Sequence, residues 1–191
     1  MKIVFATNNA HKLSEVSAVL GEGFELVTLR EVGITEDIPE TGETLDENAS
    51  QKARYVWERT GLDCFADDTG LEVEELNGAP GVRSARYATD SHDFAANNRK
   101  LLRELNGVGN RRARFRTVIS IIQGGVERQV EGTVEGVIAE KESGSEGFGY
   151  DPLFIPNGYD RTFADMSAEE KNAISHRGRA VANLVKLLAD K

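Results

Sequence analysis

Two adjacent carboxylates, Asp67 and Asp68, stand between apolar residues in the segment 65–71. Successive side chains of a β-strand point to opposite faces, so both carboxylates can face solvent only if the strand ends there. At a strand end, one carboxylate could bind a hard cation while the other orients the backbone or a ligand. The alternative is an Asp-rich turn, because Asp and Gly both suit turns. The pair therefore indicates either a metal site or a turn.

A second oxygen ligand is available from Glu40, in the predicted loop 39–43. Magnesium usually takes only one or two protein carboxylates and keeps several waters and substrate phosphates. Asp68 together with Glu40 would therefore suffice for a magnesium site. The alternative for Glu40 is an ordinary loop carboxylate.

Phosphate binding needs positive charge and backbone N–H groups, and the turn 7–12 offers both at the start of a predicted helix. Lys12 in the first turn conflicts with the helix dipole, and a bound anion would resolve that conflict. A solvated lysine is the alternative. Lys52 lies on the same face of a second predicted helix as Asn48, bordering its apolar stripe, which directs its ammonium group toward a cleft.

Two further segments carry groups suited to a nucleotide base. The segment 145–152 combines glycines with Phe148 and Tyr150. Glycines let a ligand approach closely, and aromatic rings stack on bases at roughly 1–3 kcal/mol each. A structural turn with two packed rings is the alternative. Lys171, His176 and Arg177 add donors near the end of the chain. Arg177 falls on an apolar stripe, where a guanidinium needs a partner unless it snorkels to solvent.

Hydrophobic patterns predict the elements that position these residues. Strands are predicted at 3–6, 24–29, 62–66, 113–122 and 126–140, the last two forming an antiparallel hairpin. Helices are predicted at 11–20, between Thr44 and Gly61, at 93–105, and in one final stretch that Ser167 and Glu170 cap. The strand at 62–66 would deliver Asp67 and Asp68 at its carboxyl end, where open α/β sheets bind ligands. Crossovers combined with a hairpin predict a mixed sheet.

Composition limits the class of protein. A chain of 191 residues fits a single domain over 1–191. The net charge of −9 argues against nucleic acid or an anionic membrane as a partner, because a polyanion requires a surplus of Lys and Arg. One cysteine, Cys64, permits no intramolecular disulfide and suits a reducing cytoplasm. We expect a protein that stays in solution, since no run of about 18 uncharged apolar residues occurs.

Four blocks of the sequence, taken together, closely resemble the inosine/xanthosine triphosphate pyrophosphatases, which remove non-standard purine nucleotides. The blocks are 6–12 with Glu15; 40–42 with 47–49 and 52–53; 66–71 with 78–82 and 84–87; and 147–154 with 170–178. The last two blocks are highly specific, and the resemblance spans nearly the whole chain. Asn8 replaces a glycine of many relatives and tolerates the same left-handed backbone. Thr69 replaces a frequent serine and keeps the hydroxyl.

The resemblance implies an elongated α/β fold, in which helices flank a mixed β-sheet and two lobes enclose a central cleft, and a homodimer. It implies hydrolysis of ITP, dITP and XTP to the nucleoside monophosphate and pyrophosphate, with Mg²⁺ as cofactor. Asp68 would accept a proton and, with Glu40, bind the metal. The residues implied for phosphate and sugar are Thr7, Asn8, Asn9, Ala10, His11, Lys12, Lys52 and Thr69. Those implied for the base and nearby phosphate are Phe148, Gly149, Tyr150, Asp151, Lys171, His176 and Arg177.

Donors in the segment 175–177 would favour a 6-oxo purine over adenine, which presents a 6-amino donor there. One buried donor left unpaired costs about 1–3 kcal/mol. Two alternatives remain at this point. One is a pyrophosphatase acting on dTTP or UTP, which would need a pyrimidine-sized pocket. The other is a nucleotide-binding sensor without turnover, against which the paired Asp67 and Asp68 argue.

Overall fold

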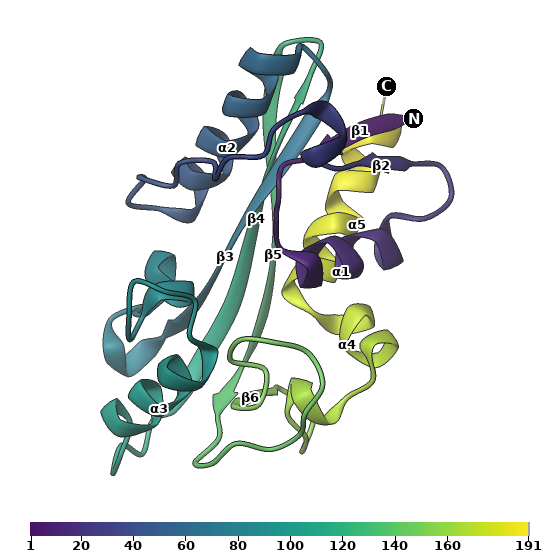
Figure 1. Cartoon of the computed structure of the whole chain (residues 1–191). Coiled ribbons are helices and arrows are strands. Elements are labelled where there is room, and N and C mark those ends of the chain that lie inside the picture. The colour runs from purple at the N-terminus through teal and green to yellow at the C-terminus, as the bar shows by residue number, and fades with distance from the viewer. Residues whose placement is uncertain (191) are drawn as a thin grey trace. The chain divides into compact units, whose positions relative to one another are not determined.

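The computed structural model describes residues 1–190, and in this range six strands form one sheet in the order β2-β1-β3-β4-β5-β6 (Figure 1). The strands are β1 (Lys2–Phe5), β2 (Glu25–Val27), β3 (Cys64–Val73), β4 (Arg112–Gln123), β5 (Val126–Ile138) and β6 (Phe154–Pro156). β1 is parallel to β2 and β3, whereas β5 and β6 are antiparallel. The predicted mixed sheet is therefore confirmed.

Side chains cap the starts of several helices. The helices are α1 (Ala10–Leu20), α2 (Leu45–Thr60), α3 (Phe94–Glu104), α4 (Ala168–Ile174) and α5 (His176–Ala189), with short 3-10 turns η1 (Arg30–Val32), η2 (Glu74–Leu76), η3 (Gly81–Arg86) and η4 (Phe163–Asp165). Asn9, Thr44 and Asp93 each accept a hydrogen bond from a backbone amide of the first turn that follows. The first three predicted helices are confirmed, with ends shifted by a residue at most.

The predicted hairpin joins β4 to β5 through Gly124 and Gly125. Both glycines have positive φ, 54° and 83°, as a two-residue type I′ turn requires. Strands that neighbour each other in a sheet across so short a connection must be antiparallel. None of the helices in residues 1–190 is both long enough and apolar enough to cross a membrane.

Two sequence predictions are wrong. The final helical stretch is not one helix, because Ser175 has an extended backbone (φ −70°, ψ 160°) and separates α4 from α5. The strand that begins near residue 62 does not end at 66 but continues to Val73, so that Asp67 and Asp68 lie inside β3. Relative to the parallel neighbour, however, the pair lies just beyond the carboxyl end of β1, whose last pairing joins Phe5 to Phe65.

Two compact units make up the described part of the chain. Unit 1 comprises residues 1–68, 117–132 and 176 onward, and unit 2 comprises residues 69–116 and 133–175. Each of β3, β4 and β5 contributes residues to both units. Two units agree with the two predicted lobes, and the central cleft stays a prediction.

In unit 1, helices cover both faces of the sheet (Figure 1). Ile3, Phe5 and Phe65 pack with apolar residues of α1 and α5. Val4 and Ala66, which alternate with them, pack with residues of α2. Because side chains alternate along a strand, residue 67 continues the α1/α5 face of β3 and residue 68 continues the α2 face. This alternation assigns the two adjacent carboxylates to different helices.

Unit 2 has its own core, in which aromatic rings meet between strands and a turn. The rings of Phe115 and Phe154 lie 4.7 Å apart between centroids, and Phe163 of η4 lies 5.2 Å from Phe154. Leu101 of α3 and Tyr150 belong to the same cluster. This core supports the glycine-rich segment that precedes β6.

Candidate active site

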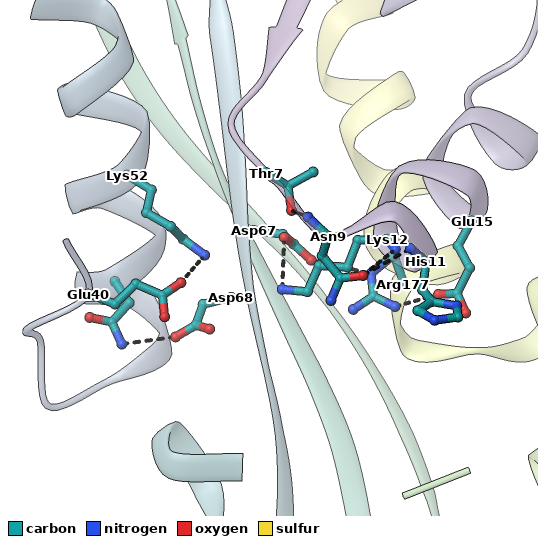
Figure 2. A network of polar contacts seen from close by, with 11 residues as sticks. Thr7, Asn9, His11, Lys12, Glu15, Glu40, Lys52, Asp67, Asp68 and Arg177 are labelled. Atoms are coloured by element: carbon teal, nitrogen blue, oxygen red, sulfur yellow. Dashed lines mark hydrogen bonds and ion pairs between the residues drawn. The ribbon is translucent and has the colours of Figure 1, made fainter. Parts of the chain in front are cut away.

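Asp67 lies on the α1/α5 face of β3 and binds two cationic side chains (Figure 2). Its Oδ1 is 3.2 Å from Lys12 Nζ of α1, and its Oδ2 is 3.3 Å from Arg177 Nε of α5. Arg177 also pairs with Glu15 of α1. Asp67 and Arg177 are each only 1% exposed. A buried ion network therefore joins β3, α1 and α5. Asp67 and Glu15 are the partners that the guanidinium of Arg177 needs on an apolar stripe.

Opposite charges in this network offset the cost of removing Asp67 and Arg177 from water. Burial alone would raise the pKa of Asp67, but Lys12 and Arg177 outweigh it and hold that pKa below the ordinary value. Burial opposes the charged form of Arg177 as well, yet Asp67 and Glu15 raise its pKa. Burial lowers the pKa of Lys12, and Asp67 only partly offsets the shift. Asp67 is thus ionised and committed to holding two cations.

The opening turn satisfies part of its own backbone. The Asn9 side-chain oxygen accepts from the amides of His11 (2.9 Å) and Lys12 (3.2 Å), and Thr7 Oγ1 accepts from the amide of Asn9 (3.1 Å). Asn8, Ala10 and His11 are exposed. The turn has the predicted place at a helix N-terminus, although two of its amides are taken by the cap.

Asp68 points to the opposite face of β3, toward α2, and is 7% exposed. Its Oδ2 accepts a hydrogen bond of 3.0 Å from Asn48 Nδ2. One turn further along α2, Lys52 Nζ lies 2.6 Å from the carboxylate of Glu40. Figure 2 shows Glu40, Lys52 and Asp68 together on the α2 side, with Asp67 on the other side of the strand. The predicted metal ligands and Lys52 therefore form one cluster.

The environment of Asp68 differs from that of Asp67. Burial raises the pKa of Asp68, and the nearby Glu40 carboxylate adds to the rise, while Lys52 and Lys12 oppose it. Burial opposes the charged form of Lys52, but Asp68 and Glu40 raise its pKa. Neighbouring carboxylates thus have separate tendencies: Asp67 stays ionised, and Asp68 has the higher proton affinity expected of a base.

The residues of the α2 cluster fit a hard divalent cation. In residues 1–190 no group of three or more His, Cys, Asp or Glu side chains is arranged to hold a metal. Magnesium needs only one or two carboxylates when phosphates and waters complete its shell. Asp68 and Glu40 offer hard oxygen donors, and Glu40 is near enough to raise the pKa of Asp68. A divalent cation would relieve that repulsion.

Unit 2 holds the glycine-rich segment. Asp151 Oδ2 accepts from the amide of Phe148 (3.0 Å) and from Lys171 Nζ (2.6 Å), and both partners of this ion pair are buried. Lys171 Nζ lies 5.0 Å from the centre of the Phe148 ring. Gly147 has φ 71°, and a Cβ there would overlap the Asp151 carboxylate. Asp151 therefore orders the loop and holds the ammonium group of Lys171 over the ring of Phe148.

Further contacts fasten this loop to the rest of unit 2. The Tyr150 hydroxyl donates to the carbonyl of Ser84 (2.7 Å) within the core, and Asn98 Nδ2 of α3 donates to the carbonyl of Gly149 (3.1 Å). Thr69 follows Asp68 on β3 and is half-buried. Tyr150 thus has a packing role that the sequence left open.

The predicted site residues divide between the units. Unit 1 holds Thr7, Asn8, Asn9, Ala10, His11, Lys12, Glu40, Lys52, Asp68, His176 and Arg177. Unit 2 holds Thr69, Phe148, Gly149, Tyr150, Asp151 and Lys171. His176 is the buried first residue of α5.

Sequence reasoning did not find the roles of Glu15 and Asn48. For Asn48 a signal existed, since a carboxamide bordering the apolar stripe of a helix needs a polar partner.

The model of the Ham1 family matches residues 3–187 of the chain. The chain belongs to the Ham1 family. Among its relatives, the dITP/XTP pyrophosphatase of Porphyromonas gingivalis is 55% identical, over 96% of this chain and 95% of that protein. The dITP/XTP pyrophosphatase of Christiangramia forsetii is 50% identical, over 99% of this chain and all (100%) of that protein.

Solved Ham1 structures have the same fold. The HAM1 protein from Coxiella burnetii superposes with a TM-score of 0.91 at 38% identity and covers 100% of both chains. The Ham1 protein of Staphylococcus aureus gives a TM-score of 0.90 at 39% identity, over 99% of this chain and 98% of that one. The predicted family and the predicted helix-flanked mixed sheet are both confirmed.

Proposed function

We propose that this Ham1 protein hydrolyses the non-standard purine nucleoside triphosphates ITP, dITP and XTP to the nucleoside monophosphate and pyrophosphate. Its relatives named dITP/XTP pyrophosphatase match essentially the full chain, which supports an enzyme of this type. The observation that carries the proposal is the register of β3. It directs Asp68 alone toward Glu40 and Lys52, while Asp67 is used to hold Lys12 and Arg177.

In the proposed reaction, Asp68 takes the proton of the water that attacks the α-phosphorus. Burial suits it to this role, because a raised pKa makes a carboxylate a stronger base. Lys12 and Lys52 stabilise the negative charge that gathers on the phosphate oxygens. Magnesium bound by Asp68 and Glu40 would supply further electrostatic stabilisation of that charge. Asp67 keeps Lys12 and Arg177 in place and does not itself exchange a proton.

The remaining assignments follow the family resemblance. We assign phosphate and sugar contacts to Thr7, Asn8, Asn9, Ala10, His11 and Thr69. We assign contacts to the base and the nearby phosphate to Phe148, Gly149, Tyr150, Asp151, Lys171, His176 and Arg177. The ring of Phe148, above the fixed ammonium of Lys171, supports a stacking role.

We also propose that the chain acts as one pyrophosphatase domain, as a homodimer, in the cytoplasm. The family model spans residues 3–187, which supports a single functional domain. The dimer rests on the family resemblance. Cys64 is buried, and burial raises the pKa of its thiol to about 12, so the thiol stays protonated. The proposal of a reducing cytoplasm rests on the presence of a single cysteine.

The test is pyrophosphate release from ITP, dITP, XTP, GTP, ATP and dTTP, with and without magnesium. We expect release from the first three at a kcat/KM well above that for GTP, ATP and dTTP, and loss of activity when magnesium is chelated. Preference for dTTP would favour a pyrimidine pyrophosphatase instead. Tight nucleotide binding without release would favour a sensor.

Asp68→Asn tests the assigned base directly. The substitution keeps the shape of the side chain but removes its proton-accepting oxygen, so kcat for ITP should fall by about 10²–10⁴-fold. Thermal unfolding followed by circular dichroism should show the fold retained. Turnover of ITP near the wild-type rate would remove Asp68 from the reaction.

A further inference from the structure

Asn48 connects the Asp68 carboxylate to the loop that carries Glu40. It is 3% exposed and uses both ends of its carboxamide. Nδ2 donates to Asp68 Oδ2 (3.0 Å), and Oδ1 accepts from the amide of Gly42 (2.7 Å). A backbone N–H can only donate and an ionised carboxylate can only accept, so the chemistry of the partners fixes the orientation of the amide.

The loop that carries Glu40 rests directly on the start of α2. A Cβ at Gly42 would lie 2.6 Å from Glu47 Cβ and 2.8 Å from Asn48 Oδ1, closer than real Cβ contacts allow. Only glycine therefore permits the Gly42 amide to reach Asn48. Gly42 is two residues from Glu40, so its contact with the start of α2 restricts the backbone position from which the Glu40 side chain extends.

We propose that Asn48 is a positioning residue, which ties the Glu40 loop to Asp68 and thereby sets the separation at which the two carboxylates meet a divalent cation. The inference rests on the proposed function, for which Glu40 and Asp68 are the metal ligands. Asn48 suits the task because an amide carries both a donor and an acceptor. A carboxylate at this position would accept from Gly42 but could donate nothing to Asp68.

Gln51 provides a matched control on the same helix and the same loop. Its Oε1 accepts from the amide of Thr41 (2.9 Å), and its Nε2 donates to Thr41 Oγ1 (3.1 Å). Gln51→Ala therefore loosens the loop one residue from Gly42 while the link between Gly42, Asn48 and Asp68 stays intact. If general order in the loop were sufficient, Gln51→Ala and Asn48→Ala would behave alike.

The experiment measures Mn²⁺ binding without nucleotide, by electron paramagnetic resonance, and ITP hydrolysis as a function of magnesium concentration. Asn48→Ala should weaken Mn²⁺ binding about 10–100-fold, as loss of a residue that orients metal ligands does. Its activity should fall at low magnesium and recover toward the wild-type level at high magnesium. Gln51→Ala should stay within about threefold of wild type in both assays.

Gly42→Ala gives an independent arm, because it displaces the link without removing a polar group, and it should reproduce the Asn48→Ala result. Circular dichroism at the assay temperature shows that each variant is folded. Wild-type Mn²⁺ affinity in Asn48→Ala, or an equal loss in Gln51→Ala, would overturn the inference. If wild type released no pyrophosphate from ITP, the proposed function would fail, while Mn²⁺ binding would still decide the role of Asn48.

Discussion

Asp67 and Asp68 are neighbours in sequence and yet perform different tasks, because a strand turns successive side chains to opposite faces. Asp67 meets Lys12 and Arg177, whereas Asp68 meets Asn48. The residue types indicated that the pair could bind a metal, with an Asp-rich turn as the alternative. Their partners were not predictable, since Arg177 lies 110 residues from Asp67 in sequence and only the fold brings them together.

Asp67→Asn should destabilise the protein strongly. The change leaves the buried Arg177 and the half-buried Lys12 beside a neutral amide, and removing one partner of a buried ion pair costs about 3–5 kcal/mol. Chemical denaturation at pH 7 measures this loss as a lower free energy of unfolding. A loss below about 1 kcal/mol would show that Glu15 alone satisfies Arg177.

The pH dependence of that loss has a defined sign. The pKa of Asp67 is lower in the folded protein than the value near 3.9 of an unfolded chain. Its stabilisation is therefore fully present above about pH 4 and disappears as the pH falls toward the folded value. The gap in unfolding free energy between wild type and Asp67→Asn should be constant from pH 5 to 7 and narrow below about pH 4. A gap that widens in acid would contradict this assignment.

At the scale of elements, local chemistry predicted the helix starts well. Asn9, Thr44 and Ser167 accept from the backbone of the helix that follows, and such caps depend on a few neighbouring residues. The break at Ser175 was missed because its cause is not local. Ile174 packs with the core of unit 2, whereas Val181 packs with the core of unit 1. One apolar stripe in the sequence therefore serves two cores.

The length of β3 was missed for a related reason. Asp67, Asp68 and Gly70 suggest a turn when only neighbours are considered. In the fold, cations from α1 and α5 and the amide of Asn48 from α2 compensate the two buried carboxylates, and the strand continues. Tertiary contacts thus override a local preference at the residues proposed to carry out the chemistry.

A substitution at Gly132 tests the close contact between the backbones of β5 and α5. A Cβ at this buried position would overlap the carbonyl oxygen of His176 and the amide nitrogen of Ala180, so the strand and the helix backbone touch there. Gly132→Ala should lower the free energy of unfolding by more than about 2 kcal/mol, because backbone cannot move aside as a flexible side chain can. Gly23→Ala, where a Cβ meets nothing within 4 Å, is the matched control and should change stability by less than about 1 kcal/mol. Equal effects in denaturant titrations would refute the close approach.

At the scale of the molecule, the acidic composition and the proposed anionic substrate are compatible because the cations are placed locally. The net charge is −9, yet Lys12 and Lys52 are both held at carboxylates on either side of β3. The composition predicted that any anion must meet such a local site. It could not predict the division into two units, since each unit is assembled from separate segments of the chain.

Because β3, β4 and β5 each supply residues to both units, we expect the chain to unfold in one cooperative transition. The single tryptophan, Trp57 on α2, reports on unit 1, while Leu153 lies fully buried in the core of unit 2. Leu153→Ala should cost about 2–5 kcal/mol. It should lower the midpoint of the Trp57 fluorescence transition by roughly 4–20 °C, together with the midpoint seen by circular dichroism. Leu184→Ala, in the core of unit 1, is the positive control. An unchanged Trp57 midpoint in folded Leu153→Ala would mean that the two units unfold independently.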